Sequence, residues 1–507
     1  MAVFPQKNDF VSTYNDGKAQ VLWTTLVADL ETSVSAYLKL AENDNYSSLL
    51  ESVEGGAIRG RYTFIGLKPD IIWRAHGDDP EINRRALSGV REDDFVPVDK
   101  GTLESLRDLF SESLIDLPEG MPPSAAGLIG YMGYDCVRLM EKLPDAKEDI
   151  LGTPDSMFMR PTIMVVFDSI TDLITVVTPV RPADDVNADT AYLHGEERLN
   201  DIVSALARPL SVQRQQEAKI DLPEAPVSNT SKERFETMVK RAQDYIAAGD
   251  IFQVVLSQRF SMPFDLPPFS LYRALRRTNP SPFLYYLKFG DFSIVGSSPE
   301  ILVRLRDNEV TIRPIAGTRP RGKNASEDKQ NAEDLLSDPK ELAEHLMLLD
   351  LGRNDVGRVS KVGSVELTDK MTIEFYSHVM HIVSNVRGEI REDYDALKAL
   401  AAGFPAGTVS GAPKVRAMQI IDELEHEKRG IYAGAVGYFS ADGSMDTCIV
   451  LRTAIVKDKT MYVQAGAGIV ADSNWQSEYA ECEAKARALV RAAEEAVHFA
   501  DQDKAIQ

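Results

Sequence analysis

The 507-residue chain has few cysteines, only Cys136, Cys448 and Cys482, and they stand far apart. Their spacing is not that of a zinc cluster or of a disulfide framework, and it fits a reducing compartment. The chain also lacks an apolar run of the roughly 18 residues that a membrane span needs. Its start, MAVFPQKNDF, has no basic segment followed by an apolar one, so we expect no secretory signal. These absences predict a cytoplasmic protein.

Positive charge is in deficit. The chain carries 56 Lys and Arg against 78 Asp and Glu, a formal net charge of −22 at pH 7. Binding to nucleic acid or to an anionic membrane requires a basic surface, so we expect neither as a partner. An anionic substrate would have to meet a local group of positive side chains. The length exceeds one ordinary hydrophobic core and predicts two domains or one large one.

One clear break in composition divides the chain. Residues 208–230, RPLSVQRQQEAKIDLPEAPVSNT, are polar, contain proline and show no periodicity. We therefore expect an N-terminal region at 1–207, a linker at 208–230 and a C-terminal region at 231–507. The sequence shows no internal repeat.

The pattern after the break mixes strands with occasional long helices. Thr230 and Glu233 form a capping-box pattern ahead of apolar residues at helical spacing, which predicts a helix that ends near Gly249. Alternation predicts a strand at 251–260. Further strands are expected at 283–287, 293–296, 309–314, 433–439, 447–456 and 461–465, and helices at 339–351, 396–402, 413–427 and 477–498. Runs of strands with few helices favour an α+β fold over a doubly wound sheet.

Two expected helices carry acidic pairs at three-residue spacing. Glu341 and Glu344 share one helix face, and Glu478 and Glu481 share another. From the residues alone, each pair is more often a solvated acidic face. Carboxylates brought to about 4 Å would repel by roughly 4 kcal/mol at an effective dielectric near 20. Such a cluster would favour a hard cation such as Mg²⁺, which takes oxygen ligands.

Three glycine-containing segments could approach a ligand through their backbone. The segment 403–414, GFPAGTVSGAPK, is not a nucleotide phosphate loop, because Ala412 and Pro413 occupy the required glycine and lysine positions. The triplet from Gly466 to Gly468 could present backbone N–H groups to a carboxylate. The segment 314–322, PIAGTRPRG, adds two arginines suited to carboxylates. Its ordinary interpretation is a basic turn.

These segments together resemble the chorismate-utilising enzymes. PIAGTRPRG matches their active-site block, and GFPAGTVSGAPK matches their FPxGTxxGxPK signature. The resemblance runs from about residue 20 to about residue 495, and its best match is the anthranilate synthase component I family. It implies a large α+β fold with β-sheets packed around a cleft and helices outside. It also implies a reaction that depends on Mg²⁺ and converts chorismate and ammonia to anthranilate and pyruvate.

The resemblance assigns roles to residues that would be unremarkable singly. It implies Mg²⁺ ligation by Glu344 and Glu481, supported by Glu341 and Glu478. It makes His381, Glu300 and Thr318 the catalytic residues, with Glu300 protonating the departing hydroxyl, although a lone histidine in an apolar run is usually part of a core. It implies that the substrate is held by Gly317, Thr318, Tyr432, Arg452, Gly466, Ala467, Gly468 and Lys485.

Two positions separate this chain from other members of that group. Aminodeoxychorismate synthases typically carry lysine, a covalent nucleophile, where this chain has Ala316. Isochorismate and salicylate synthases typically carry a lysine base where it has Gln253, and glutamine cannot take up a proton. A methyl group cannot replace the nucleophilic lysine, so Ala316 separates the chain from aminodeoxychorismate synthases, and Gln253 is better suited to ammonia as the nucleophile.

The N-terminal region carries a regulatory pattern of the resembling family. LLES at 49–52 and NPSPF at 279–283 imply a tryptophan inhibitor site with contacts from Ser52, Pro282, Phe283 and Leu284. No cysteine lies in a glutaminase motif, so a separate glutamine amidotransferase subunit, and hence a hetero-oligomer, is expected. Two alternatives stay open. One is a 2-amino-2-deoxyisochorismate synthase, and the other is a catalytically silent tryptophan-binding sensor or scaffold.

Overall fold

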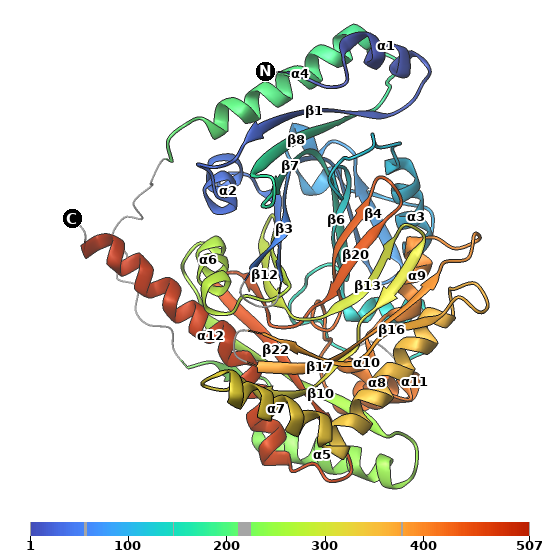
Figure 1. Cartoon of the computed structure of the whole chain (residues 1–507), viewed down its shortest axis with the longest axis vertical. Coiled ribbons are helices and arrows are strands. Elements are labelled where there is room, and N and C mark those ends of the chain that lie inside the picture. The colour runs from blue at the N-terminus through green and yellow to red at the C-terminus, as the bar shows by residue number, and fades with distance from the viewer. Residues whose placement is uncertain (1, 55–57, 145–146, 211–224, 377–378, 506–507) are drawn as a thin grey trace.

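The computed structural model describes residues 2–54, 58–144, 147–210, 225–376 and 379–505. Within them, every pairing between named strands is antiparallel, and the pairings link all the strands into one network (Figure 1). The helices lie outside it. The predicted α+β fold with helices outside is confirmed.

The strands in chain order are β1 Gln20–Val27, β2 Tyr46–Glu54, β3 Ile58–His76, β4 Asp79–Asn83, β5 Val96–Pro97, β6 Gly127–Met132, β7 Ser156–Asp168, β8 Leu173–Val180, β9 Val227–Ser228, β10 Gln253–Pro263, β11 Phe283–Phe289, β12 Phe292–Ser298, β13 Ile301–Arg306, β14 Glu309–Ile312, β15 Ile315–Pro320, β16 Glu366–Phe375, β17 Val379–Glu389, β18 Gly411–Ala412, β19 Ala435–Ser440, β20 Met445–Ile449, β21 Thr453–Lys457 and β22 Thr460–Ile469. The α-helices are α1 Lys7–Asn15, α2 Ser33–Ala41, α3 Thr102–Ser113, α4 Ala188–Leu206, α5 Lys232–Ala247, α6 Pro268–Thr278, α7 Ala325–Ser337, α8 Pro339–Gly357, α9 Ala396–Gly403, α10 Gly407–Ser410, α11 Lys414–Leu424 and α12 Trp475–Ala505.

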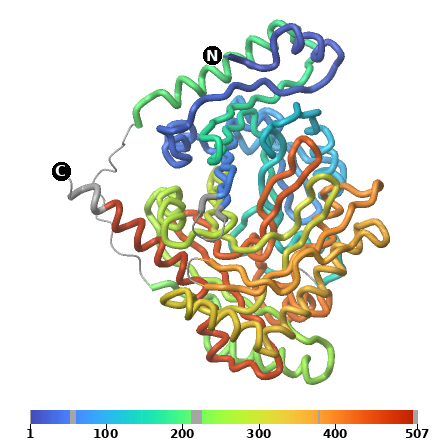
Figure 2. Tube along the Cα trace, viewed as in Figure 1, coloured from blue at the N-terminus to red at the C-terminus, as the bar shows by residue number. Residues whose placement is uncertain are grey.

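One continuous ladder winds through the molecule. Its neighbours in order are β10, β22, β21, β12, β11, β2, β3, β7, β6, β19, β20, β13, β14 and β17. Strands from before and after residues 208–230 therefore pair directly, at β11 with β2 and at β19 with β6. The N-terminal segments fill the upper part of Figure 2, and the C-terminal segments fill the lower part. Residues 211–224 of the expected linker lie outside the described residues.

Helices α5, α11 and α12 cover the end of the ladder that holds β10 and β22. Phe235, Ile421 and Cys482 from these helices pack with Val254 and Ile469 in one buried cluster. The contact follows from the sequence, because each helix has apolar residues at helical spacing on one face and the strands are apolar on the side they bury.

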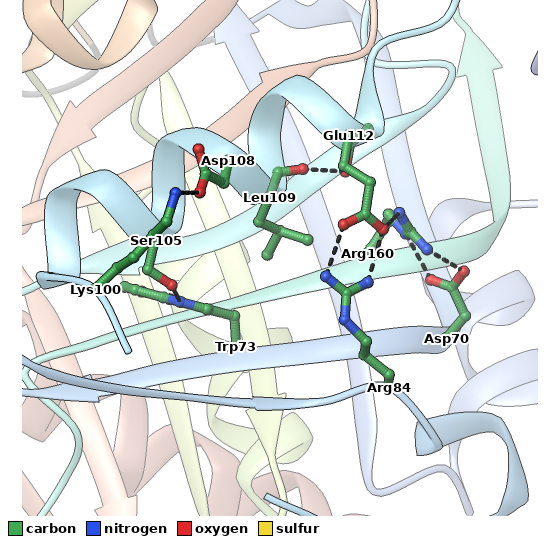
Figure 3. Close-up of polar contacts among 10 residues, drawn as sticks. Asp70, Trp73, Arg84, Lys100, Ser105, Asp108, Leu109, Glu112 and Arg160 are labelled. Atoms are coloured by element: carbon green, nitrogen blue, oxygen red, sulfur yellow. Dashed lines mark hydrogen bonds and ion pairs between the residues drawn. The ribbon is translucent and has the colours of Figure 1, made fainter. Parts of the chain in front are cut away.

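A network of ion pairs around the buried Arg160 fastens α3 to the N-terminal strands (Figure 3). Arg160 on β7 is 6% exposed and donates to both carboxylate oxygens of Asp70 on β3, at 2.8 and 2.7 Å. It also donates to Glu112 on α3 at 3.0 Å, and Glu112 accepts two 2.7 Å bonds from Arg84. Bidentate pairs of this kind fix geometry as well as charge.

Several predicted boundaries are wrong for local reasons. The cap of α5 is Ser231, whose hydroxyl accepts from the Arg234 N–H, whereas the Thr230 hydroxyl contacts Asn229. The strand predicted at 309–314 ends at Ile312, and a second strand begins at Ile315.

Two further boundaries differ beside the candidate site. The strand predicted at 447–456 is two strands, because Arg452 adopts φ +47° and the halves pair with different neighbours. The helix predicted at 413–427 runs from Lys414 to Leu424, since Glu425 is extended. The first break changes the direction of the chain at Arg452, and the second changes it at Glu425.

Candidate active site

Strands β15 and β17 bring Thr318 and His381 face to face. A bulge between Ala316 and Thr318, with Gly317 at φ +71°, turns the Gly317 carbonyl toward the imidazole. His381 Nδ1 lies 3.0 Å from that carbonyl oxygen and 3.1 Å from Thr318 Oγ1. Because a carbonyl only accepts, Nδ1 carries the proton and Nε2 is the basic nitrogen. Burial lowers the pKa of His381, which keeps the ring neutral.

Glu300 is placed between β12 and β13 and receives a 3.0 Å hydrogen bond from Thr408 Oγ1 on α10. Burial raises the pKa of its carboxyl, although Thr408, Arg452 and Lys485 oppose the rise. The group is therefore biased toward its protonated form, which is the form a general acid requires.

Arg452 stands in the break between β20 and β21 beside Glu300. Burial lowers the pKa of its guanidinium, and the Glu300 charge partly offsets this. Across the described residues, no carboxylate lies within 4.0 Å of the guanidinium. A partly buried guanidinium without such a partner suits an incoming carboxylate.

Lys485, Tyr432 and the glycine triplet lie around one part of β22. Lys485 Nζ donates to the Gly466 carbonyl at 2.9 Å, and a Cβ on Gly466 would lie 2.8 Å from the buried Tyr432 hydroxyl. The residues Gly466, Ala467 and Gly468 pair with β10 on one edge, whereas β21 pairs only with 460–463. The structure thus brings these predicted substrate-binding residues together.

The two acidic pairs also converge, from α8 and α12. Burial raises the pKa of Glu344, with further increases from Glu341 and Glu481, and burial and Glu481 raise the pKa of Glu478. Glu481 accepts an ion pair from Lys485 at 2.7 Å, and Glu341 accepts one from Arg319 at 3.2 Å. A bound cation would relieve this mutual repulsion among carboxylates.

These oxygen donors fit Mg²⁺ better than a softer metal. In the part of the chain that the structure describes, no three His, Cys, Asp or Glu side chains are close enough to hold a metal ion by themselves. Mg²⁺ usually keeps water molecules and substrate oxygens and needs only one or two carboxylates. One glutamate from each helix would satisfy that requirement.

The two discriminating positions lie at this site. Gln253 is 7% exposed, and its Nε2 points to Glu344 Oε1 at 3.4 Å. Gly468 makes room for it, because a Cβ there would lie 2.3 Å from Nε2. Ala316 is opposite Ile382 in the ladder and carries no nucleophile.

The predicted inhibitor contacts form a second group on β2 and β11. Ser52 pairs with Phe283, and Leu284 pairs with Glu51. Ser52 Oγ donates to the Tyr62 carbonyl at 3.2 Å, and Pro282 directly precedes β11. On its other edge Phe283 pairs with Ser298, two residues before Glu300. The predicted inhibitor contacts and Glu300 are therefore connected through the strand pairing of β11 with β12.

Some residues at the site were not singled out from the sequence. Thr408 and Lys414 lie within the GFPAGTVSGAPK segment, and Arg429 lies three residues before Tyr432. Lys414 forms a 2.8 Å partly buried ion pair with Asp355. The position of Thr408 and Lys414 in that segment was the available signal, but nothing in the sequence showed which partners they or Arg429 would meet.

The sequence profile described as chorismate binding enzyme matches residues 68–491. The chain belongs to this family. It is 56% identical to anthranilate synthase component 1 of Cereibacter sphaeroides over 491 residues, covering 97% of this chain and 98% of that protein. It is 49% identical to the protein of that name from Pseudomonas putida over 474 residues, covering 92% and 93%.

Two solved structures share the fold of this chain. The structure of anthranilate synthase component I from Streptococcus pneumoniae superposes with a TM-score of 0.74 at 38% identity, covering 92% of this chain and 99% of that one. The menaquinone-specific isochorismate synthase of Escherichia coli shares the fold, with a TM-score of 0.69 at 17% identity over 96% and 98% of the chains. The homology identifies a chorismate-utilising enzyme related to anthranilate synthase component 1. None of the helices in the described residues combines the length and the apolarity needed to cross a membrane.

Proposed function

We propose that the protein is the Mg²⁺-dependent large subunit of an anthranilate synthase, which converts chorismate and ammonia to anthranilate and pyruvate in the cytoplasm. The observation that supports this best is the pair of discriminating side chains. Gln253 lies beside Glu344 and offers no base to activate water, and Ala316 offers no amine. Ammonia needs no such base because it is nucleophilic when uncharged.

In the proposed reaction, Arg452, Lys485, Tyr432 and the 466–468 backbone hold the two carboxylates of chorismate. A C–N bond forms as the ring hydroxyl leaves as water with the proton of Glu300. His381 Nε2, the unprotonated nitrogen of the ring, would then take the ring hydrogen as a proton, and the enolpyruvyl C–O bond breaks as the ring becomes aromatic. The departing enolpyruvate is protonated on its methylene carbon to give pyruvate, and the extra proton of the new C–N group restores Glu300. Mg²⁺ bound by Glu344 and Glu481 would make the ring carboxylate a better electron sink.

We propose that ammonia comes from a glutamine amidotransferase subunit, which makes the working enzyme a hetero-oligomer. The curated relatives are named component 1, a name that implies a second component. All three cysteines of this chain are buried, and burial raises the pKa of each thiol. A glutaminase nucleophile needs an accessible thiolate, which none of them supplies.

We propose that tryptophan inhibits the enzyme by binding at Ser52, Pro282, Phe283 and Leu284. The Ser52 hydroxyl can bond a polar group of the ligand, and Phe283 can pack against its ring. Since Phe283 also pairs with Ser298 beside Glu300, a shift of β11 would be felt at the proposed general acid.

One assay separates the candidate functions. Purified protein is given chorismate, Mg²⁺ and an ammonium salt, with and without tryptophan, and anthranilate is followed by its fluorescence. We expect anthranilate and pyruvate in equal amounts, and inhibition by tryptophan. Accumulation of 2-amino-2-deoxyisochorismate would favour the alternative synthase, and tryptophan binding without turnover would favour a sensor. Without ammonium, chromatography should find no isochorismate or salicylate, and either product would contradict the role given to Gln253.

A further inference from the structure

Arg429 is a buried cation immediately behind the candidate site. It is 2% exposed, and its Nε and Nη2 donate to Glu425 Oε2 and Oε1 at 2.9 and 2.6 Å. Glu425 can meet it because α11 ends at Leu424 and the chain turns to an extended conformation. The result is a bidentate pair inside the molecule rather than a pair along a helix surface.

This pair is bonded to β10 at two points. Arg429 Nη2 donates to the Val255 carbonyl at 2.7 Å, and Glu425 Oε1 accepts from the N–H and the hydroxyl of Ser257 at 2.8 and 2.9 Å. In the ladder, Val255 is opposite Gly468 and Ser257 is opposite Gly466. Those glycines are proposed to receive a substrate carboxylate.

The same guanidinium is bonded to α10 and stacks near Tyr432. Arg429 Nη1 donates to the Val409 carbonyl at 2.7 Å, and the preceding residue, Thr408, makes the hydrogen bond to Glu300. The guanidinium carbon is 5.6 Å from the centre of the Tyr432 ring. One side chain therefore touches three segments that carry proposed functional groups.

We propose that Arg429, paired with Glu425, is a positioning residue that holds α10, β10 and Tyr432 in the arrangement the reaction requires. This inference deepens the proposed function and depends on it. Arg429 itself does not face substrate, and it acts through Thr408 on Glu300 and through β10 on the glycine triplet.

A purely stabilising role is the alternative that the test must separate. A buried ion pair gives little net stability over an apolar replacement of the same shape, because desolvation opposes the attraction. Arg160 supplies a comparison, since it is also buried and bidentate. Its carboxylate partners lie on β3 and α3 (Figure 3), and neither element carries a proposed functional group.

The test compares Arg429→Lys with Arg160→Lys. Lysine keeps the charge, but one ammonium cannot span Glu425, Val255 and Val409 together. We expect Arg429→Lys to lower kcat/KM for anthranilate formation at least tenfold and to weaken chorismate binding measured by calorimetry. Arg160→Lys should lower the melting temperature and leave both quantities within twofold of wild type.

The pH profile supplies a readout that lost stability would not move. The groups that face Glu300 are Thr408, Arg452, Lys485, Tyr376 and Tyr432. Activity falls as pH rises through the pKa of the acid, and the Thr408 bond holds that pKa down. If Arg429→Lys releases α10, the alkaline limb of kcat should move to higher pH. Thr408→Val should move it in the same direction.

An unchanged limb together with near-normal kcat/KM in folded Arg429→Lys would overturn the inference. If Arg429→Lys does not fold, Glu425→Gln replaces it, because glutamine preserves the volume of Glu425 and weakens the same pair. An unchanged alkaline limb of kcat together with near-normal kcat/KM in that variant would likewise overturn the inference. The proposed function fails separately, because in that case the wild type itself would form no anthranilate from chorismate and ammonium.

Discussion

Substitution of Gly468 by alanine tests how the candidate site is assembled. The added Cβ would lie 2.3 Å from Gln253 Nε2, 3.4 Å from its Cδ and 3.8 Å from its Cγ. Only the amide end of the Gln253 side chain collides with the new Cβ. The backbone at position 468 therefore need not move, and the Gln253 side chain must rotate. We therefore expect Gly468→Ala to fold normally while it drives the Gln253 amide away from Glu344.

The expected cost can be estimated from the two changes. Holding a side chain off its preferred rotamer costs about 0.5–1.5 kcal/mol. Hydrogen bonds to charged groups contribute about 1.5–3 kcal/mol, and a length of 3.4 Å places this one at the low end. A loss of about 2 kcal/mol that is felt in full in the transition state corresponds to a fall of about thirtyfold in kcat/KM. Anthranilate fluorescence at several Mg²⁺ concentrations measures it.

A double-mutant cycle decides between this cause and direct obstruction of substrate. Gln253→Ala removes the colliding amide, so Gly468→Ala should have little further effect in that background. If the two effects simply add, the reasoning from the collision is refuted and the Cβ blocks substrate instead. Gly357→Ala is the matched control, because a Cβ there meets nothing within 4 Å, and its activity should equal that of wild type.

Three further predictions address separate parts of the molecule. Glu481→Ala should abolish Mg²⁺-dependent turnover with an unchanged circular dichroism spectrum, and near-normal activity would refute its role as a ligand. Ser52→Ala should weaken tryptophan inhibition with little change in the uninhibited rate, so identical inhibition curves would exclude it from the inhibitor site. Burial raises the pKa of Asp135 from 3.8 to about 6. The native state then binds more protons than the unfolded chain, and this carboxyl should remove about 3 kcal/mol of stability as pH rises from about 4 to 6. Urea unfolding of Asp135→Asn should lack that loss, and a pH dependence equal to wild type would contradict the prediction.

The amino-acid sequence alone determined the class of fold and the list of candidate site residues. Helix and strand periods are local properties, so the strand near 251–260 and the helix near 477–498 could be predicted from apolar spacing. The identities of Ala316 and Gln253 likewise needed no structure, because a missing amine is visible in the sequence. Boundaries were less predictable where long-range partners decide them, as at Arg452, where the two strands pair with different neighbours.

Only the tertiary structure decided which of these groups meet. The opposition of Thr318 and His381, the approach of Glu344 to Glu481, and the Arg429 contacts join segments that are far apart in the chain. Strand register and helix packing set those distances, and neither is a property of a single segment. Burial is also collective, since it is the surrounding protein that raises the pKa of Glu300 and lowers that of His381.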